Sequence, residues 1–223
     1  MDTYRTFVAI ELPGALRAKL IEYIQQLRRA VPDARASWSR EHNLHLTLKF
    51  LGSVPVGDMP KLSDAIVAAV SGIESFELTV AGCGVFPPKG RPNVLWIGVL
   101  PSERSTHDVF YGDFSQHPKP STEPPELSRH PTPDTRHPVF HLHSAIENKC
   151  AAAGFVREQR AFHPHLTIAR LRKTGDERRL AEAHQKLGFA PETFAVSEVV
   201  VFKSELLREG SKHTPISRHA LKG

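Results

Sequence analysis

His45-Leu46-Thr47-Leu48, within NLHLTLKFLG (43–52), and His165-Leu166-Thr167-Ile168, within FHPHLTIAR (162–170), repeat one short pattern. Side chains in a β-strand alternate between its two faces. Each histidine therefore shares a face with the threonine two residues later, and the aliphatic residues point the other way. The pattern predicts two strands, each with an imidazole and a hydroxyl on one face and an apolar surface on the other.

Strict alternation also places the neighbours of the two pairs. The side chains expected on the apolar face of the first strand are Leu44, Leu46, Leu48 and Phe50. On the second strand, alternation places Arg170 on the face of Leu166 and Ile168, so a bend or the strand end must redirect it if it is to reach His165. A third His-x-Thr copy, His130-Pro131-Thr132, lies in a proline-rich stretch, and we interpret it as a chance match to a short motif.

The two pairs suit phosphoryl chemistry. The unperturbed pKa of histidine, about 6.5, lets it act as a base or an acid near neutral pH. Hydrolysis of a phosphodiester takes a proton from the attacking water and gives one to the leaving oxygen, on opposite sides of phosphorus. One histidine on each side of the phosphate meets this need, and threonine hydroxyls would donate to the non-bridging oxygens. The pattern predicts hydrolysis without a metal or another cofactor.

Composition and charge restrict the class of protein. The chain has 223 residues, 40% of them hydrophobic, a net charge of +5 and a pI near 9.4, which suits a polyanionic partner such as nucleic acid. It has no apolar run of about 18 residues and no signal-peptide pattern at its start, so we expect no membrane partner. Cys83 and Cys150 lack metal or redox spacing and predict free thiols in a cytoplasmic protein.

The elements alternate irregularly between strands and helices. Besides the two motif strands, the sequence predicts strands at 4–11, 76–86, 93–100, 193–203 and 215–221 and helices at 13–30, 59–71, 139–153 and 176–187. Each half contains a helix, a His-Leu-Thr strand and a second helix. This order predicts an α+β fold with antiparallel sheets and two pseudo-equivalent lobes, with the motifs facing across a groove.

Residues 101–137 differ from the rest of the chain. They hold seven of the 18 prolines, four of the 13 histidines and only five apolar residues. They also carry four Lys or Arg and six Asp or Glu, so the remainder of the chain has a net charge of +7. We expect an inserted excursion, or alternatively a lid or RNA-contacting loop, within one bilobal domain spanning residues 1–223.

The two motifs, the opening YRTFVAIELP (4–13) and the segment GVFPPKGRPNVLWIGV (84–99) resemble the 2H phosphoesterases. The resemblance is closest to bacterial RNA 2′,3′-cyclic phosphodiesterases of the LigT/ThpR type, once called 2′-5′ RNA ligases. It covers residues 3–100 and 139–222. It implies a bilobal, pseudo-twofold fold of two antiparallel sheets that flank a groove, with helices outside, and a monomer that opens terminal RNA 2′,3′-cyclic phosphates to 2′-phosphates.

The same resemblance implies roles for single residues. By family role His45 protonates the leaving 3′ oxygen, His165 activates water, Thr47 and Thr167 bind phosphate, and Arg170 adds a cation. An exposed structural role for Arg170 stays open.

Three further residues are weaker candidates. Phe50 and Trp96 are candidates for stacking a base, although strand aromatics more often belong to the core. His163 makes a His-Pro-His sequence with His165, but no carboxylate or cysteine nearby completes a metal site. His163 would instead shape the groove or orient a catalytic neighbour.

Two other functions stay open at this stage. One is a module that binds RNA ends without turnover, against which the two intact His and Thr pairs argue. The other is a cyclic phosphodiesterase that acts on small nucleotides. The reverse reaction, 2′-5′ joining of RNA ends, is allowed by microscopic reversibility.

Overall fold

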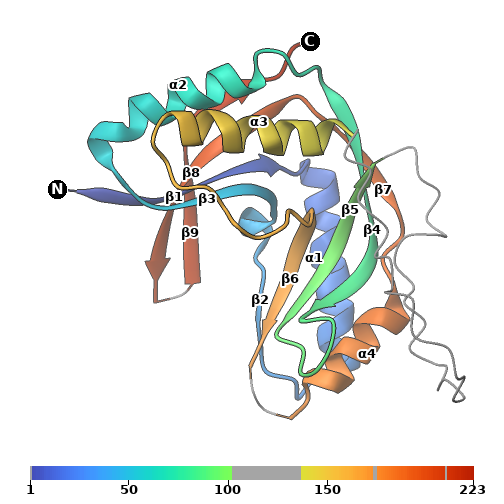
Figure 1. The fold of residues 1–223 in the computed structure, drawn as a ribbon. Helices are drawn as coiled ribbons and strands as arrows, with labels where there is room; N and C mark the ends of the chain where they lie inside the picture. Colours follow the sequence, from blue (N-terminus) through green and yellow to red (C-terminus); the bar gives the residue numbers. More distant parts are fainter. Residues whose placement is uncertain (1, 102–136, 173–174, 209) are drawn as a thin grey trace, which may run out of the picture.

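Two antiparallel sheets form the frame of the chain in the computed structural model, which describes residues 2–101, 137–172, 175–208 and 210–223. In spatial order, sheet I contains β3 (His45–Pro55), β1 (Thr3–Glu11), β8 (Glu198–Leu207) and β9 (Gly210–Ala220). In the same way, sheet II contains β2 (Ala36–Trp38), β6 (His165–Leu171), β5 (Val94–Pro101), β4 (Phe76–Phe86) and β7 (Glu192–Val196). The two motif strands therefore belong to different sheets (Figure 1).

Two helices accompany each sheet (Figure 1). The helices α2 (Met59–Val70) and α3 (Pro138–Ala152) pack together and contact strands of sheet I. The helices α1 (Gly14–Ala30) and α4 (Glu177–Leu187) contact each other, and α4 contacts β4 of sheet II. Two 3₁₀ turns, η1 (Glu41–Asn43) and η2 (Val56–Asp58), flank β3. The predicted α+β class with two antiparallel sheets is confirmed.

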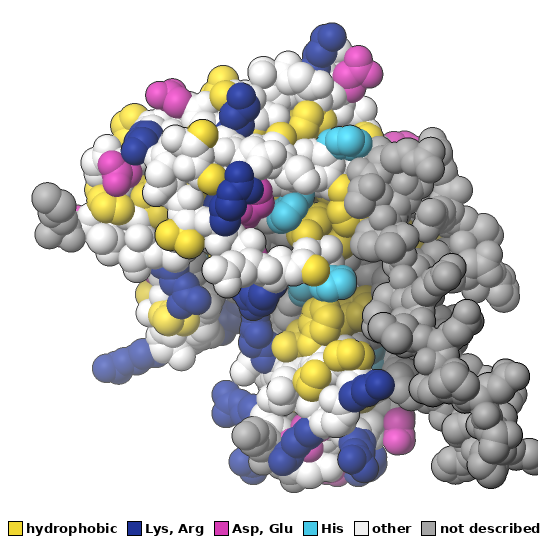
Figure 2. All heavy atoms as spheres, in the orientation of Figure 1, with side chains coloured by type: hydrophobic (Ala, Val, Ile, Leu, Met, Phe, Trp, Pro, Cys, Tyr) yellow, Lys and Arg dark blue, Asp and Glu magenta, His cyan; other side chains and the backbone are white. Residues whose placement is uncertain are grey.

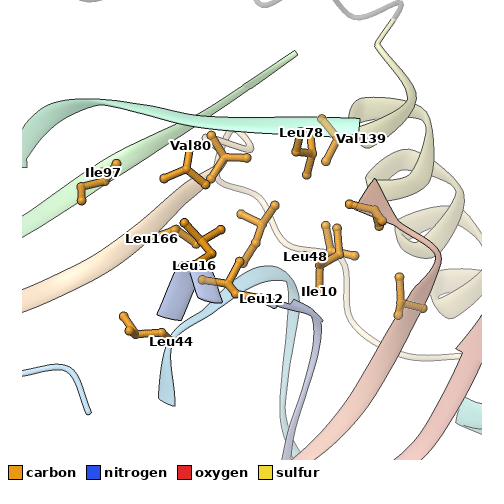
Figure 3. Close-up of a cluster of buried hydrophobic side chains, with 14 of the residues drawn as sticks. Ile10, Leu12, Leu16, Leu44, Leu48, Leu78, Val80, Ile97, Val139 and Leu166 are labelled. Atoms are coloured by element: carbon orange, nitrogen blue, oxygen red, sulfur yellow. The ribbon is translucent and has the colours of Figure 1, made fainter. Parts of the chain in front are cut away.

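One apolar core joins the two lobes. The helical spacing of Leu16, Leu20, Ile24 and Leu27 places all four buried on one face of α1. The same cluster contains Leu48 from β3 and Leu166 from β6, which Figure 3 shows with Leu16 among the buried side chains. The aliphatic residues of both motifs thus hold their strands against a common interior, as the alternating pattern predicts.

A buried polar network supports sheet II from behind. His184 of α4 is fully buried, and its Nε2 donates to the carbonyl of Trp96 at 3.0 Å. The hydroxyl of Tyr23 on α1 lies 2.7 Å from His184 Nδ1 and 3.3 Å from Cys83 Sγ. Cys83 and Cys150 are free thiols, as expected. This network fixes both helices of the second lobe to β5.

Two predicted strands had wrong bounds, and one strand was missed. The stretch predicted as one strand over 193–203 divides at Ser197 into β7 and β8, which belong to different sheets. The last strand begins at Gly210 rather than 215, because β9 pairs with β8 along its whole length. The short strand β2 was not predicted. The insert predicted over 101–137 lies, except at its two ends, outside the described residues, so the division into domains stays a prediction.

Across the residues that the structure describes, every helix is too short or too polar to cross a bilayer.

Candidate active site

Both motif strands contain a β-bulge at the same place. In β3 the pairing with β1 runs from Ala9 opposite Thr47 to Val8 opposite Lys49, which leaves Leu48 without a partner of its own. In β6 the pairing with β5 runs from Trp96 opposite Thr167 to Leu95 opposite Ala169, which skips Ile168. A bulge of this kind adds one residue and shifts the alternation of the strand. The two motifs are therefore equivalent in backbone geometry as well as in sequence.

The bulges reverse the faces of the residues that follow them. Phe50 pairs with Phe7, on the face that carries Thr47, and its side chain is 53% exposed. The prediction that Phe50 faces the core was wrong, because it assumed strict alternation through Leu48. Arg170 is moved in the same way to the face of Thr167, and it is exposed. The two positions are equivalent in the two motifs.

His45 is half-buried among aromatic side chains of sheet I. Its ring stacks on Phe7 with centroids 4.8 Å apart, and Phe7 stacks in turn on Phe202 at 5.1 Å. The ring of His213, from β9, meets His45 edge-on at 5.2 Å. Burial first, and then the nearby His213, lower the pKa of His45 to about 4, and a hydrogen bond with the backbone of Asn43 opposes them.

His165 has a matching surrounding on sheet II. Its ring meets Phe86 edge-on at 5.0 Å and Trp96 at 6.2 Å. Its Nδ1 donates to the carbonyl of His163 at 2.6 Å. Burial lowers the pKa of His165, and the charges of His163 and Arg170 lower it further, against the hydrogen bond to the His163 backbone. Since Nδ1 is occupied by the carbonyl, Nε2 holds the free lone pair of the neutral ring.

Positive charge lies near His165 and near His213, the neighbour of His45. The charge of Arg170 acts on His165, and the charges of Arg5 and His42 act on His213. Burial is the first cause that lowers the pKa of His213, ahead of these two groups. Such a site favours an anion, whose charge would offset the neighbouring cations. Sequence reasoning missed His213 and Phe7 because they come from other strands, and no local motif marks either of them.

The remaining candidates differ in exposure. Trp96 is 9% exposed and packs between Phe86 and Gly84, where a Cβ on Gly84 would lie 2.1 Å from the indole. The structure thus makes Trp96 a wall of the site, whereas Phe50 presents an open ring. His163 is exposed, and its backbone carbonyl orients His165. Within the described residues, no three His, Cys, Asp or Glu side chains gather closely enough to hold a metal ion.

The two motif strands meet where the lobes join. β3 contacts β6, and the segment before β3 runs alongside β6 as β2. Ser39 Oγ donates to the carbonyl of Thr167 at 2.6 Å, and Asn43 Nδ2 donates to the carbonyl of Ser211 at 2.8 Å. Both motifs are thereby fixed to the connection between the sheets. Figure 2 shows the surface hollowed between the upper and lower parts of the molecule, with Lys and Arg side chains at its edge.

A bilobed α+β fold with one His-x-Thr motif in each lobe is the arrangement of the 2H phosphoesterases. The family model described as LigT like Phosphoesterase matches residues 10–96 and 131–213, and the chain belongs to this family.

Relatives of known name align with nearly the whole chain. The RNA 2′,3′-cyclic phosphodiesterase of Thermotoga maritima is 28% identical over 92% of this chain and 89% of its own length. The Escherichia coli protein of the same name is 25% identical over 99% of this chain and 98% of its own.

Solved structures agree in fold. The Escherichia coli LigT structure complexed with 3′-AMP superposes with a TM-score of 0.66 at 22% identity, and all of both chains is covered. The TT0787 structure of Thermus thermophilus superposes with a TM-score of 0.68 at 20% identity over 98% of each chain.

Proposed function

We propose that the protein hydrolyses RNA 2′,3′-cyclic phosphate ends to 2′-phosphomonoesters. The observation that carries the proposal is the pair of bulged strands. Each lobe presents a histidine and a threonine, followed by one redirected side chain, which is Phe50 in the first lobe and Arg170 in the second. The names of the relatives from Thermotoga maritima and Escherichia coli support the same substrate class. The reverse 2′-5′ joining of RNA ends would use the same groups.

In the proposed mechanism His165 is the base. Its Nδ1 donates to the His163 carbonyl, so its Nε2 is free to accept the proton of the attacking water. Its lowered pKa keeps the ring neutral at pH 7, which is the state a base requires.

His45 is the proposed acid, which donates a proton to the leaving 3′ oxygen. With a pKa of about 4, its ring by itself is almost entirely neutral at pH 7. A bound phosphate diester carries a negative charge, and a negative charge beside an imidazole raises its pKa. Substrate binding would therefore supply the protonated state, and the acid would form only when the phosphate is in place.

The other site residues would hold the phosphate and the terminal nucleobase of the substrate. Thr47 and Thr167 would donate to the non-bridging oxygens, and Arg170 would add a positive charge on the side of His165. The ring of Phe50, which is exposed on the face of Thr47, would stack the terminal nucleobase.

Kinetics with a 2′,3′-cyclic mononucleotide test these roles. Replacing His45 or His165 by alanine should reduce kcat by several orders of magnitude, and Thr47→Ala or Thr167→Ala by about 10–10³-fold, as for loss of one charge-stabilising donor. His130→Ala is the matched control, because it removes a histidine from the third His-x-Thr copy, and it should leave kcat unchanged. Full activity of His45→Ala, or loss of activity in His130→Ala, would contradict the assignment. Tight RNA-end binding without turnover by the unmodified protein would favour the binding module instead.

A further inference from the structure

A second basic site lies at the far end of the β6 strand. It is a hollow of about 680 Å³ between the end of α1, the edge strand β2 and the residue after β6. Its lining includes four arginines, Arg28, Arg29, Arg35 and Arg172, and the ring of Trp38. In Figure 2, Lys and Arg side chains gather at the lower end of the molecule, where these segments meet in Figure 1.

Positive charge predominates in the lining of this hollow. Arg28, Arg29 and Arg35 are exposed, and in the described part of the chain none of the three forms an ion pair. None of the described lining residues carries a carboxylate. Guanidinium groups that lie close together repel one another and favour a bound anion, and their planar fork binds phosphate or carboxylate through two hydrogen bonds.

The volume of the hollow and the Trp38 ring favour a nucleotide over a single ion as the ligand. A volume of about 680 Å³ falls within the range of 300–1,000 Å³ that is typical of sites for ligands of nucleotide size. Trp38 is half-exposed, so part of its ring is open for a base to stack on. Arginines beside an aromatic face are the usual components of sites for single-stranded nucleic acid.

Two strands connect this hollow to the candidate active site. β2 pairs with β6 from Ala36 opposite Leu171 to Trp38 opposite Ala169, and Ser39 then bonds to Thr167. Arg170 lies on the face of Thr167, and Arg172 comes two residues later in the hollow. At 3.2–3.4 Å per residue, the path from Thr167 to Arg172 is roughly 16 Å. The cations thus continue from the reacting end around the edge of sheet II.

We propose that this arginine hollow binds the phosphodiester backbone of the RNA strand a few nucleotides away from its cyclic phosphate end. The inference deepens the proposed function and rests on it for the placement of that end. It implies that the enzyme prefers oligonucleotides to mononucleotides and that this preference weakens with salt.

The test compares two charge-matched double variants. Arg28→Ala/Arg35→Ala removes two positive charges from the hollow. Lys61→Ala/Lys149→Ala removes two exposed positive charges from α2 and α3, which lie at the opposite end of the molecule in Figure 1. Each protein is assayed with a 2′,3′-cyclic mononucleotide and with an octanucleotide that has the same end. Binding of an octanucleotide with an ordinary 3′-hydroxyl end is measured separately, so that RNA binding by the hollow is tested even if none of the proteins hydrolyses its substrate.

The hollow variant should raise KM for the octanucleotide at least about tenfold, because two charge-assisted contacts are lost. It should leave mononucleotide kcat and KM unchanged. The plot of log affinity against log salt should become shallower by about 1.4, at about 0.7 per phosphate contact to a single strand. The control variant should change none of these values by more than about twofold, as expected for screened charges far from the strand.

Two results would overturn the proposal. One is an octanucleotide affinity that falls equally in both variants, which would show only a general effect of net charge. The other is a hollow variant that loses binding of free ATP but keeps octanucleotide affinity and KM, which would make the hollow a nucleotide site unrelated to the RNA strand. A third result separates the two proposals: no protein hydrolyses either substrate, but octanucleotide binding is weakened in the hollow variant alone. This result would contradict the proposed function and support RNA binding by the hollow.

Discussion

Replacing Lys49 by methionine should destabilise the protein more than any exposed lysine change. Lys49 follows the bulge in β3, and its side chain is fully buried. Its Nζ donates to Glu147 Oε1 at 2.7 Å and to the carbonyl of Val156 at 2.8 Å. The other oxygen of Glu147 accepts from the backbone nitrogen of Glu158 at 3.2 Å. These bonds connect the first motif strand to α3 and to the segment that leads into His165.

The magnitude follows from what the substitution leaves behind. The Glu147 side chain is 8% exposed, so Lys49→Met leaves a buried carboxylate without its cation. Breaking a buried pair by removing one partner costs about 3–5 kcal/mol, a large part of the roughly 5–15 kcal/mol that stabilises a domain. Lys49→Met/Glu147→Leu removes both charges and should recover most of that loss, because no charge then stays unpaired.

Urea unfolding followed by circular dichroism measures these free energies. The matched control is Lys19→Met, which breaks the ion pair with Glu192, where the two side chains are 55% and 28% exposed. It should cost no more than about 1 kcal/mol, as exposed pairs do. A loss below about 1 kcal/mol for Lys49→Met, or a double variant no more stable than Lys49→Met, would refute the reasoning.

Two further predictions concern the packing of Trp96 and the burial of His45. Gly84→Ala should displace the Trp96 indole and lower the free energy of unfolding by about 1–3 kcal/mol through overpacking, as measured by tryptophan fluorescence and urea unfolding. The control Gly72→Ala adds a Cβ that meets nothing within 4 Å, so it should change neither quantity. An unchanged Trp96 emission in Gly84→Ala would contradict the packing. The second prediction follows from the pKa of about 4 for His45 in the folded protein. Because His45 in the unfolded chain takes up a proton near pH 6.5, the free energy of unfolding should fall as the pH drops from about 6.5 to 4. This group alone should contribute a loss of about 3 kcal/mol. His45→Gln should flatten that dependence in unfolding measured at each pH, and an equal slope in both proteins would show that His45 is not buried as described.

The motif strands were predictable because their period is local. The alternation of His45, Leu46, Thr47 and Leu48 places the imidazole and hydroxyl opposite the core residues without any knowledge of the partner strand. The apolar spacing along α1 predicts its buried face in the same way. These features depend on the backbone geometry of one element.

The bulges and the partners across strands were not predictable. Whether Leu48 has its own partner depends on the register with β1, which the β3 sequence does not specify. For this reason Phe50 was placed on the wrong face, and the redirection of Arg170 had no identified cause. His213 reaches His45 only because β9 pairs with β8 at the far edge of sheet I. Contacts that need the whole sheet are outside what a local pattern predicts.

The most direct test of the central claim is the product formed from a 2′,3′-cyclic nucleotide in EDTA and ¹⁸O-labelled water, followed by ³¹P NMR. If His165 activates water and His45 protonates the 3′ oxygen, the product is the 2′-phosphomonoester with the label on phosphorus. Neither His45→Ala nor His165→Ala should form it at a comparable rate. A 3′-phosphomonoester, or turnover that stops in EDTA and returns with added Zn²⁺ or Mn²⁺, would contradict the two-histidine mechanism.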